Sequence, residues 1–489
     1  MDFILFLAAG FILLLAFMLV RTTRLMRFPE PVEPVELPVV DKPVISSHLS
    51  EAISFKTISR EAMAEGDYQP FLDLHQWIFR TYPKIGQALK TEVINQHSLL
   101  LFWQGSEASL QPILFNAHMD VVPVAEDTLP AWTHPPFQGV IQGGYVWGRG
   151  ALDMKCHMVG LLDAVESLLV AGYTPRRSIY LSFGHDEEIM GFEGARRMVD
   201  YLKSKSVQLA AVLDEGSMIS QGLLPGVHTP VALIGVAEKG YATFNISAKA
   251  KPGHSSMPPR QTAIGIVSRA IALLDDHPMP SRLDILLPTL MRIGHLLPFW
   301  LQVMVANSWL FKPLIIRGLQ KNAQTKAVLQ TTHAATMIQG GIKDNILPAS
   351  AIAKVNCRLL PGDSLDAVIQ WVKQVVNDPR VEVSLDEQAG GWEASRITPT
   401  DSPAYRSLEL VTRQVFDNLT AAPMIFLAAT DSRHFQPICS HIFKFSPFVV
   451  STEDFSGVHG INERISQDSL AKMGVFYSRL MRVWGDAGF

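Results

Sequence analysis

The chain has 489 residues, of which 48% are hydrophobic and 18% charged, so it is long enough for several domains with a substantial core. This ordinary composition excludes a collagen, a coiled coil and a wholly disordered chain. The 42 basic and 46 acidic residues give a formal charge of -4, which argues against nucleic acid and other polyanions as partners. The three cysteines are odd in number and widely spaced, so we expect free thiols.

The first predicted element is an apolar helix at the N-terminus. Residues 3–20 carry no charge, and 18 helical residues at about 1.5 Å each come close to crossing a roughly 30 Å hydrocarbon core. Asp2 precedes the run and three arginines follow it, whereas a cleaved signal peptide would place its basic residues first. We therefore predict a single-pass membrane anchor over residues 1–22. The arginines favour the cytoplasmic side for the bulk of the chain, but the opposite orientation stays open.

A proline-rich linker is predicted next, over residues 23–45. Its five prolines lie between Pro29 and Pro43 with Val and Glu among them, which favours an extended spacer. The rest of the chain divides into a first domain in two pieces and a domain inserted between them. The predicted boundaries are 46–230 for the first piece, 231–388 for the inserted domain and 389–489 for the second piece.

Apolar runs alternate with helical patterns in the first piece, which predicts an α/β sheet. The expected strands are 111–116, 177–183 and 209–213, and the expected helices are 157–170 and 194–202. Ionisable residues follow each strand. Because ligands bind past the carboxyl ends of strands in open α/β sheets, we expect these residues to share one site.

The inserted domain has a different pattern, typical of a sheet covered by helices. Strand pairs are expected over 231–249, further strands at 351–360 and 381–385, and helices at 262–274 and 364–376. The chain is then expected to return to the first domain with two helices. These are 404–416 and 466–484.

The ionisable residues form a ligand set of carboxylates with two imidazoles, which suits zinc or a similar divalent ion better than a thiolate site would. They are His118, Asp120, Asp153, Glu187, Glu188, Asp214 and His459. A pair of metal ions would need a bridging carboxylate and an acidic residue that takes a proton from the attacking water. With 46 acidic residues and 15 histidines, any single pair could arise by chance. Their joint placement after successive strands favours a functional site.

Nine short strings make the chain resemble a known family. They are AHMDVVP (117–123), GRGALDMK (148–155), GHDEE (184–188), LDEG (213–216), GHSSMPP (253–259), NILP (345–348), RLLPG (358–362), TDSR (430–433) and HGINE (459–463). Together they resemble the carboxypeptidase S and aminoacylase family of dizinc metallopeptidases. More narrowly, they resemble the branch of yeast vacuolar carboxypeptidase S and the N-fatty-acyl-amino-acid synthase/hydrolase. The resemblance covers nearly everything after residue 45. It implies a mixed-sheet catalytic domain with an inserted two-layer α+β lid and dimerisation domain.

The resemblance also implies roles for individual residues. Asp153 would bridge two zinc ions, with His118 and Asp214 completing one shell and Glu188 and His459 the other. Cobalt or manganese could replace zinc. The remaining implied roles belong to residues around the metals. Asp120 would orient His118, Glu187 would be the general base, His254 would stabilise the oxyanion from the other subunit of a homodimer, and Asn345 and Arg358 would hold the substrate carboxylate.

We therefore expect a metal-dependent hydrolase that cleaves the amide bond to a C-terminal amino acid with a free carboxylate. Its substrate would be a short peptide or an N-acyl amino acid. One alternative is a dipeptidase or a deacylase of another small metabolite, and an alternative of another class is an inactive, membrane-tethered binding module.

Residues 283–316 form a mostly apolar segment within the inserted domain. Its internal charges and prolines argue against a membrane span. Two readings stay open. The segment could pack as short core helices between the domains, or it could line an apolar groove that leads to the metal site.

Overall fold

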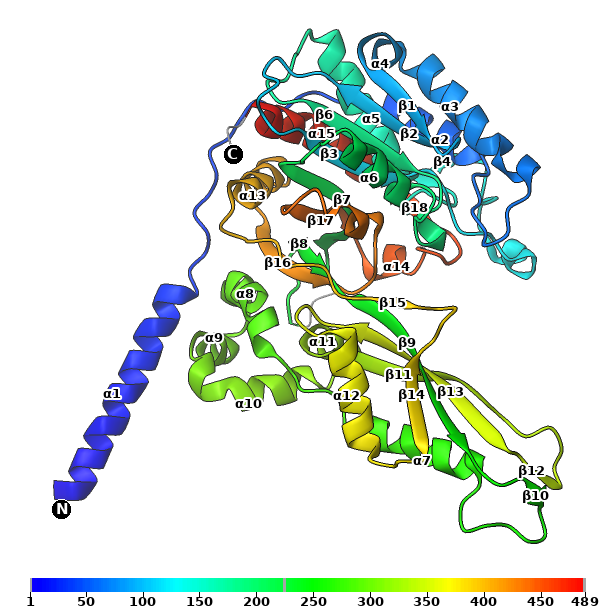
Figure 1. The fold of residues 1–489 in the computed structure, drawn as a ribbon. Coiled ribbons are helices and arrows are strands. Elements are labelled where there is room, and N and C mark those ends of the chain that lie inside the picture. The colour runs from blue at the N-terminus through cyan, green and yellow to red at the C-terminus, as the bar shows by residue number, and fades with distance from the viewer. Residues whose placement is uncertain (1, 223–225, 487–489) are drawn as a thin grey trace.

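The computed structural model describes residues 2–222 and 226–486 and is built around an eight-stranded mixed sheet (Figure 1). In spatial order the strands are β1 (Lys90–Ile94), β2 (Ser98–Trp103), β6 (Ile179–Gly184), β3 (Ile113–His118), β7 (Ala211–Ser220), β17 (Ile442–Val450), β8 (Val231–Glu238) and β16 (Thr420–Phe426). The central strands β6, β3, β7 and β17 are parallel to their neighbours in this group. The strands expected at 111–116, 177–183 and 209–213 are β3, β6 and β7, although β7 continues to Ser220.

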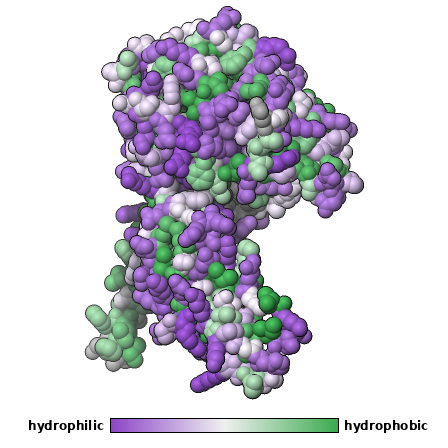
Figure 2. All heavy atoms as spheres, turned by 45° about the vertical axis from the view of Figure 1, so that its right-hand side comes forward, coloured by the Kyte–Doolittle hydropathy of each residue, from purple (hydrophilic) through white to green (hydrophobic). Residues whose placement is uncertain are grey.

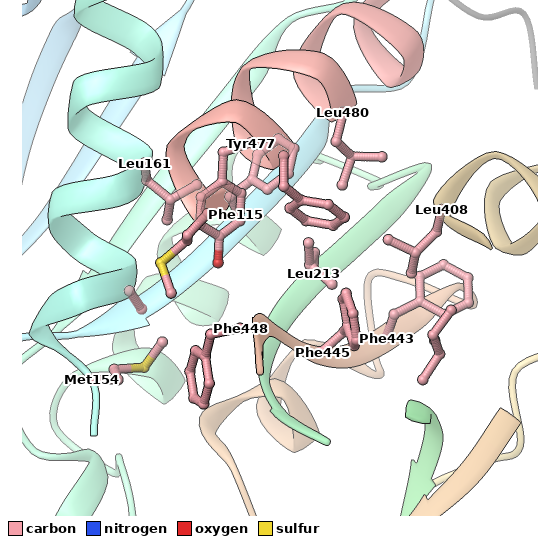
Figure 3. Packing of buried hydrophobic residues seen from close by; sticks show 14 of the residues in the cluster. Phe115, Met154, Leu161, Leu213, Leu408, Phe443, Phe445, Phe448, Tyr477 and Leu480 are labelled. Atoms are coloured by element: carbon pink, nitrogen blue, oxygen red, sulfur yellow. The ribbon is translucent and has the colours of Figure 1, made fainter. Parts of the chain in front are cut away.

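Helices cover both faces of the sheet. On one face lie α2 (Lys42–Ser54), α5 (Lys155–Val170), α13 (Pro403–Val415) and α15 (Gln467–Asp486), with α3 (Gln69–Thr81) and α4 (Pro83–Ala88) beside them. The other face is covered by α6 (Ala195–Ser204). Figure 3 shows the main core, where Phe115 of β3 meets Tyr477 of α15 and Leu161 of α5. Burying each such side chain contributes about 1.5–3 kcal/mol, so the core fixes the strand ends that carry the site.

The inserted domain is a second sheet with two helices on it. Its strands are β11 (Thr332–Gly340), β13 (Ser350–Leu359), β9 (Gly240–Lys249), β14 (Val381–Leu385) and β15 (Gly391–Trp392), and its helices are α7 (Ala263–Asp276) and α12 (Leu365–Val376). The pair β10 (Gly253–His254) and β12 (Ile346–Leu347) forms the tip of this inserted domain, which we call the lid after its predicted role (Figure 1). Since β8 belongs to the large sheet, the lid begins at β9 and not at residue 231 as expected.

Four helices follow α7 in sequence but pack on the domain of the large sheet. They are α8 (Leu283–Ile293), α9 (Phe299–Ala306), α10 (Ser308–Leu319) and α11 (Ala323–Leu329). Helix α8 lies against β16, and apolar side chains of all four helices join the core of the large sheet. The expected assignment of this segment to the lid is therefore corrected, because its burial is against the first domain.

The N-terminal helix α1 (Asp2–Leu25) projects from the body, and Figure 2 shows its apolar end standing clear at the lower left. Among the described residues, α1 is the single helix that is long and apolar enough to cross a membrane unaided. The residues after it run in extended form past α13, where the Val32 amide donates to Asn418 Oδ1.

The remaining elements are short. They are β4 (Val140–Gln142), β5 (Tyr145–Trp147) and β18 (Arg464–Ser466) in a small sheet, α14 (Thr452–Phe455), and the 3₁₀ turns η1 (Glu65–Tyr68), η2 (Glu126–Ala131), η3 (Glu187–Ile189), η4 (Gly294–Leu296) and η5 (Asp431–Phe435). All three cysteines are buried and free.

Candidate active site

The site lies past the carboxyl ends of β3, β6 and β7. His118 is the last residue of β3, Glu187 and Glu188 form the turn η3 after β6, and Glu215 lies within β7. Two loops complete the group with Asp153, just before α5, and His459, just before β18. Segments far apart in the sequence thus bring carboxylates and imidazoles to one edge of the sheet, where open α/β folds bind ligands.

Asp153 lies between the two histidines. Its Oδ1 is 3.1 Å from His118 Nε2, and its Oδ2 is 3.1 Å from His459 Nε2. Two ligands bonded at about 2.0–2.1 Å to one tetrahedral zinc ion lie roughly 3.3 Å apart. Each oxygen of Asp153 is therefore placed to share a cation with one histidine, which is the arrangement of a bridging carboxylate.

Two groups of ligand atoms emerge around this bridge. His118, Asp153 and Glu188 form one group, and His118, Glu187 and Glu215 form the other. Within the second group Glu187 Oε2 lies farther from His118 Nε2, at 3.9 Å, than Glu215 Oε1 does, at 3.3 Å. On the far side of the bridge, His459 Nε2 is 3.1 Å from Glu188 Oε2.

Glu215 occupies the place that the sequence analysis gave to Asp214. Glu215 Oε1 is 3.3 Å from His118 Nε2. Asp214 is instead held by amides: its Oδ1 accepts from Asn116 Nδ2 at 2.9 Å, and its Oδ2 accepts from the Ser432 amide at 2.8 Å. Asp214 therefore lies outside both groups, and Glu215 was missed because adjacent residues of one strand are hard to tell apart by sequence.

Asp120 connects His118 to the turn η3. It is fully buried, and His118 Nδ1 lies 2.9 Å from its backbone carbonyl oxygen and 3.3 Å from its Oδ1, which leaves Nε2 facing the carboxylates. Its two oxygens also accept the backbone amides of Glu187 and Glu188, each at 3.1 Å. Asp120 thus fixes the imidazole through its carbonyl and carboxylate oxygens, and it fixes the turn η3 through its carboxylate.

Glu463, whose role the sequence analysis did not assign, holds the loop that presents Asp153. Its Oε1 accepts the amides of Gly150, Leu152 and Asp153 at 2.8–3.1 Å. Its Oε2 lies 2.6 Å from Arg149 Nη1 in a buried ion pair. Glu463 is the last residue of the HGINE string, but its contacts with the loop before α5 can be seen only in the folded chain.

The crowding of carboxylates changes their protonation. Burial, aided by the charge of Asp153, raises the pKa of Glu215 to about 8. Burial also raises the pKa of Glu187 well above its ordinary value, although the nearby His118 opposes the shift. Hydrogen bonds to Asp153 and Glu188 raise the pKa of His459 to about 10. A cation bound among these carboxylates would favour their charged forms and so oppose the effect of burial.

The residues fit a pair of divalent cations. Within the described ranges, Asp153, Glu187, Glu188 and Glu215 form ion pairs only with His118 and His459. Glu188 Oε1 is buried and has no hydrogen-bond partner there. The two histidines carry a charge only when protonated, so four largely buried carboxylates share at most two protein cations in the described part of the chain. Metal ions at these positions would reduce the cost of burying the remaining charge.

His254, Asn345 and Arg358 do not join the metal site in a single chain. His254 and Asn345 are exposed at the lid tip, where the Ser255 amide donates to the carbonyl of Asn345 at 3.1 Å. Arg358 lies in β13 at the other end of the lid, with its guanidinium 4.9 Å from the centre of the Tyr241 ring. Among the described residues it forms no ion pair.

A cavity of about 850 Å³ opens beside the carboxylates. Asp153, Glu187, Glu188, Glu215 and His459 line one end of it. The rest of its wall is mostly apolar and comes from β16, β17 and the helices α8–α11. Both predictions for the segment 283–316 therefore hold: its helices pack on the core, and they also line an apolar cavity. Trp300 lines that cavity.

Comparison with known proteins identifies the family. The model of Peptidase family M20/M25/M40 matches residues 114–483. The chain is 36% identical to the N-fatty-acyl-amino acid synthase/hydrolase of Xenopus tropicalis over 97% of this chain and 93% of that protein. It is also 36% identical to a probable carboxypeptidase S-like protein of Dictyostelium discoideum over 90% of this chain and 84% of that protein.

A solved structure supports the fold. The M20 family metallo-carboxypeptidase of Sulfolobus solfataricus superposes with a TM-score of 0.64 at 18% identity, and the match covers 90% of this chain and 99% of that one. The family match also confirms the resemblance that the nine strings indicated. The chain therefore belongs to Peptidase family M20/M25/M40 and is a hydrolase of the metallopeptidase and amidohydrolase kind.

Proposed function

We propose that the chain is a membrane-anchored, dizinc amidohydrolase that releases an amino acid with a free carboxylate from an N-fatty-acyl amino acid. The observation that carries this proposal is the apolar cavity of about 850 Å³ that ends at the metal-site carboxylates. Its size is that of a small-molecule site, and its apolar walls suit a hydrocarbon chain better than a polar peptide. The name of the Xenopus relative, an N-fatty-acyl-amino acid synthase/hydrolase, points to the same substrate class.

Bound zinc would supply positive charge that lowers the pKa of water and polarises the amide carbonyl. His118, Asp153, Glu188, Glu215 and His459 would hold it. The remaining chemistry belongs to Glu187. Its backbone is fixed by Asp120, and its carboxylate faces the cavity, so it is placed to take a proton from water and return it to the leaving nitrogen.

Arg358 is our candidate for recognition of the substrate carboxylate. Its guanidinium stacks on Tyr241, which in turn stacks on Trp392 with ring centres 4.9 Å apart. This stacking orients the planar guanidinium group of Arg358, which has no carboxylate partner among the described residues. His254 and Asn345 lie at the opposite end of the lid, so we propose that a second copy of the chain brings its lid tip to this site. Sedimentation of the purified chain as a dimer would support this.

Arg358→Ala is expected to lower kcat/KM for free-carboxylate substrates by about 10- to 150-fold, the effect of removing a charge-assisted hydrogen-bonding partner. The matching carboxamide substrates should lose much less, because they offer no charge to the guanidinium. Comparing kcat/KM for each pair measures the difference, with Arg380→Ala on the lid surface as the control. An unchanged preference for the carboxylate would assign Arg358 a structural role.

Acyl-chain length tests the proposed substrate class. Each buried methylene stabilises binding by up to roughly 0.8 kcal/mol, so kcat/KM should rise at least several-fold from N-acetyl to N-octanoyl amino acids, with an upper limit on the order of a thousandfold for six added methylenes. Trp300→Ala should flatten this slope without altering the metal content, because Trp300 lines the cavity. Trp309→Ala is the control, since this similarly exposed tryptophan is absent from the cavity wall. A flat profile in the wild-type chain would favour short peptides as substrates.

A further inference from the structure

Helices α9 and α10 present an apolar face to the outside of the molecule. Five large apolar side chains on these two consecutive helices are 45–62% exposed: Phe299, Trp300, Trp309, Leu310 and Leu314. Single exposed apolar residues are common on soluble proteins, but a group of this size on one helical hairpin marks an interaction surface. We call these five side chains the α9–α10 face.

The α9–α10 face lies beside the apolar helix α1. Asn307, at the corner between α9 and α10, donates from Nδ2 to the carbonyl of Met18 at 3.3 Å. Arg21 Nε donates to the carbonyl of Ala306 at 2.8 Å. Met18, Thr22 and Met26 of α1 are buried at four-residue spacing. These contacts make the hairpin continuous with the C-terminal part of α1, and Figure 1 shows α9 beside that end.

The same contacts set the depth of the hairpin relative to α1. Met18 lies three residues before Arg21, which at a rise of about 1.5 Å per residue is roughly 4.5 Å into the apolar run. Arginines that end a membrane span sit at headgroup level. A corner attached to Met18 therefore lies at the boundary between headgroups and hydrocarbon, which is where tryptophan side chains such as Trp300 and Trp309 are enriched.

The inner side of the same hairpin lines the cavity. Trp300 of α9 and Leu314 of α10 are more than half exposed, and both also line the cavity wall. Trp300 and Leu314 therefore belong both to the α9–α10 face and to the wall of the cavity that ends at Glu187 and Glu188. This double placement points to an opening of the cavity between α9 and α10.

We propose that the α9–α10 face inserts into the outer part of the lipid bilayer beside α1, and that fatty-acyl substrates enter the cavity sideways from the bilayer between Trp300 and Leu314. The entry route rests on the proposed substrate class, and the insertion rests on the proposed membrane anchor α1 but not on the proposed chemistry. Apolar helices that lie at an interface bury their apolar side in the acyl boundary. The covering partner is thus lipid and not a second protein.

Site-specific labelling of the full chain in lipid nanodiscs tests the insertion. The native cysteines are buried, so Leu310→Cys offers a selective site for an environment-sensitive fluorophore. Its emission should be quenched by lipids that carry spin labels in the acyl chain and protected from aqueous iodide. Val170→Cys is the matched control, because Val170 is 68% exposed at the end of α5 and should show the reverse. Quenching of the Leu310 label by iodide, or its protection from both quenchers by a protein partner, would overturn the proposal.

The entry route is tested by activity with two kinds of substrate. Trp309→Glu should lower kcat/KM for an N-palmitoyl amino acid dissolved in the nanodisc bilayer by roughly tenfold, because a carboxylate resists insertion. Hydrolysis of a water-soluble N-acetyl amino acid should not change, and Trp309→Phe should retain both activities. Equal loss on both substrates, or no loss on either, would contradict lateral entry. Quenching at Leu310 in a chain that hydrolyses neither substrate would instead count against the proposed function alone.

Discussion

Glu187→Gln is expected to lower kcat by at least about 100-fold, because the substitution removes the group that takes a proton from water and returns it to the leaving nitrogen. The metal content should stay at the wild-type level, since the amide keeps the shape of the side chain and Asp120 would still bind the backbone of η3. Steady-state kinetics and elemental analysis of the same protein sample measure the two quantities.

Glu188→Gln is the matched control on the adjacent residue. Glu188 Oε2 lies 3.1 Å from His459 Nε2, so its loss should reduce metal binding as well as activity. If Glu187→Gln lost metal and Glu188→Gln kept it, the roles of the two glutamates would be exchanged.

Glu215→Gln is expected to reduce the bound metal from about two ions to about one per chain, and to lower kcat/KM by at least roughly 100-fold. The reason is that Glu215 Oε1 faces His118 Nε2 at 3.3 Å, within one of the two ligand groups. Elemental analysis after dialysis against a defined zinc concentration gives the stoichiometry.

Asp214→Asn provides the comparison for Glu215, because the neighbouring residue has the same charge but lies outside both ligand groups. Its carboxylate binds Asn116 and the Ser432 amide, so the variant should keep both ions at saturating zinc. Loss of one ion from Asp214→Asn, with both retained in Glu215→Gln, would restore Asp214 as the ligand.

The ambiguity between these two residues shows where sequence reasoning ends. Side chains alternate between the two faces of a strand. Which of Asp214 and Glu215 can serve as a metal ligand therefore depends on which face of β7 is turned toward His118. The pairing of β7 with β17 is irregular between Lys444 and Ser446, opposite the stretch of β7 that begins at Asp214. Such an irregularity re-aims side chains locally, and no sequence pattern in β7 reports it.

Local patterns predicted most elements well. Helix α5 was expected at 157–170 and spans Lys155–Val170, and β14 was expected and found at Val381–Leu385. Both follow from hydrophobic periodicity, which is a property of the segment itself. The family strings were similarly informative, because each holds its chemistry within a few residues.

Contacts between distant segments were harder to anticipate. Helices α8–α11 are encoded within the stretch predicted as the lid but pack on β16 of the large sheet. The expected domain boundary at residue 231 failed for a similar reason, since β8 and β9 are both apolar strands and only their pairing separates them. The packing of α8–α11 and the position of the domain boundary both depend on which apolar surfaces pack together, and this is determined by the whole fold.

The most direct test of the proposed function is the hydrolysis of an N-palmitoyl amino acid by the full chain in nanodiscs, followed by mass spectrometry before and after metal chelation. The account predicts equal amounts of free fatty acid and free amino acid, loss of both products when the metal is removed, and recovery when zinc is restored. Undiminished release from the fully demetallated chain, or no release from the chain loaded with about two zinc ions, would contradict it.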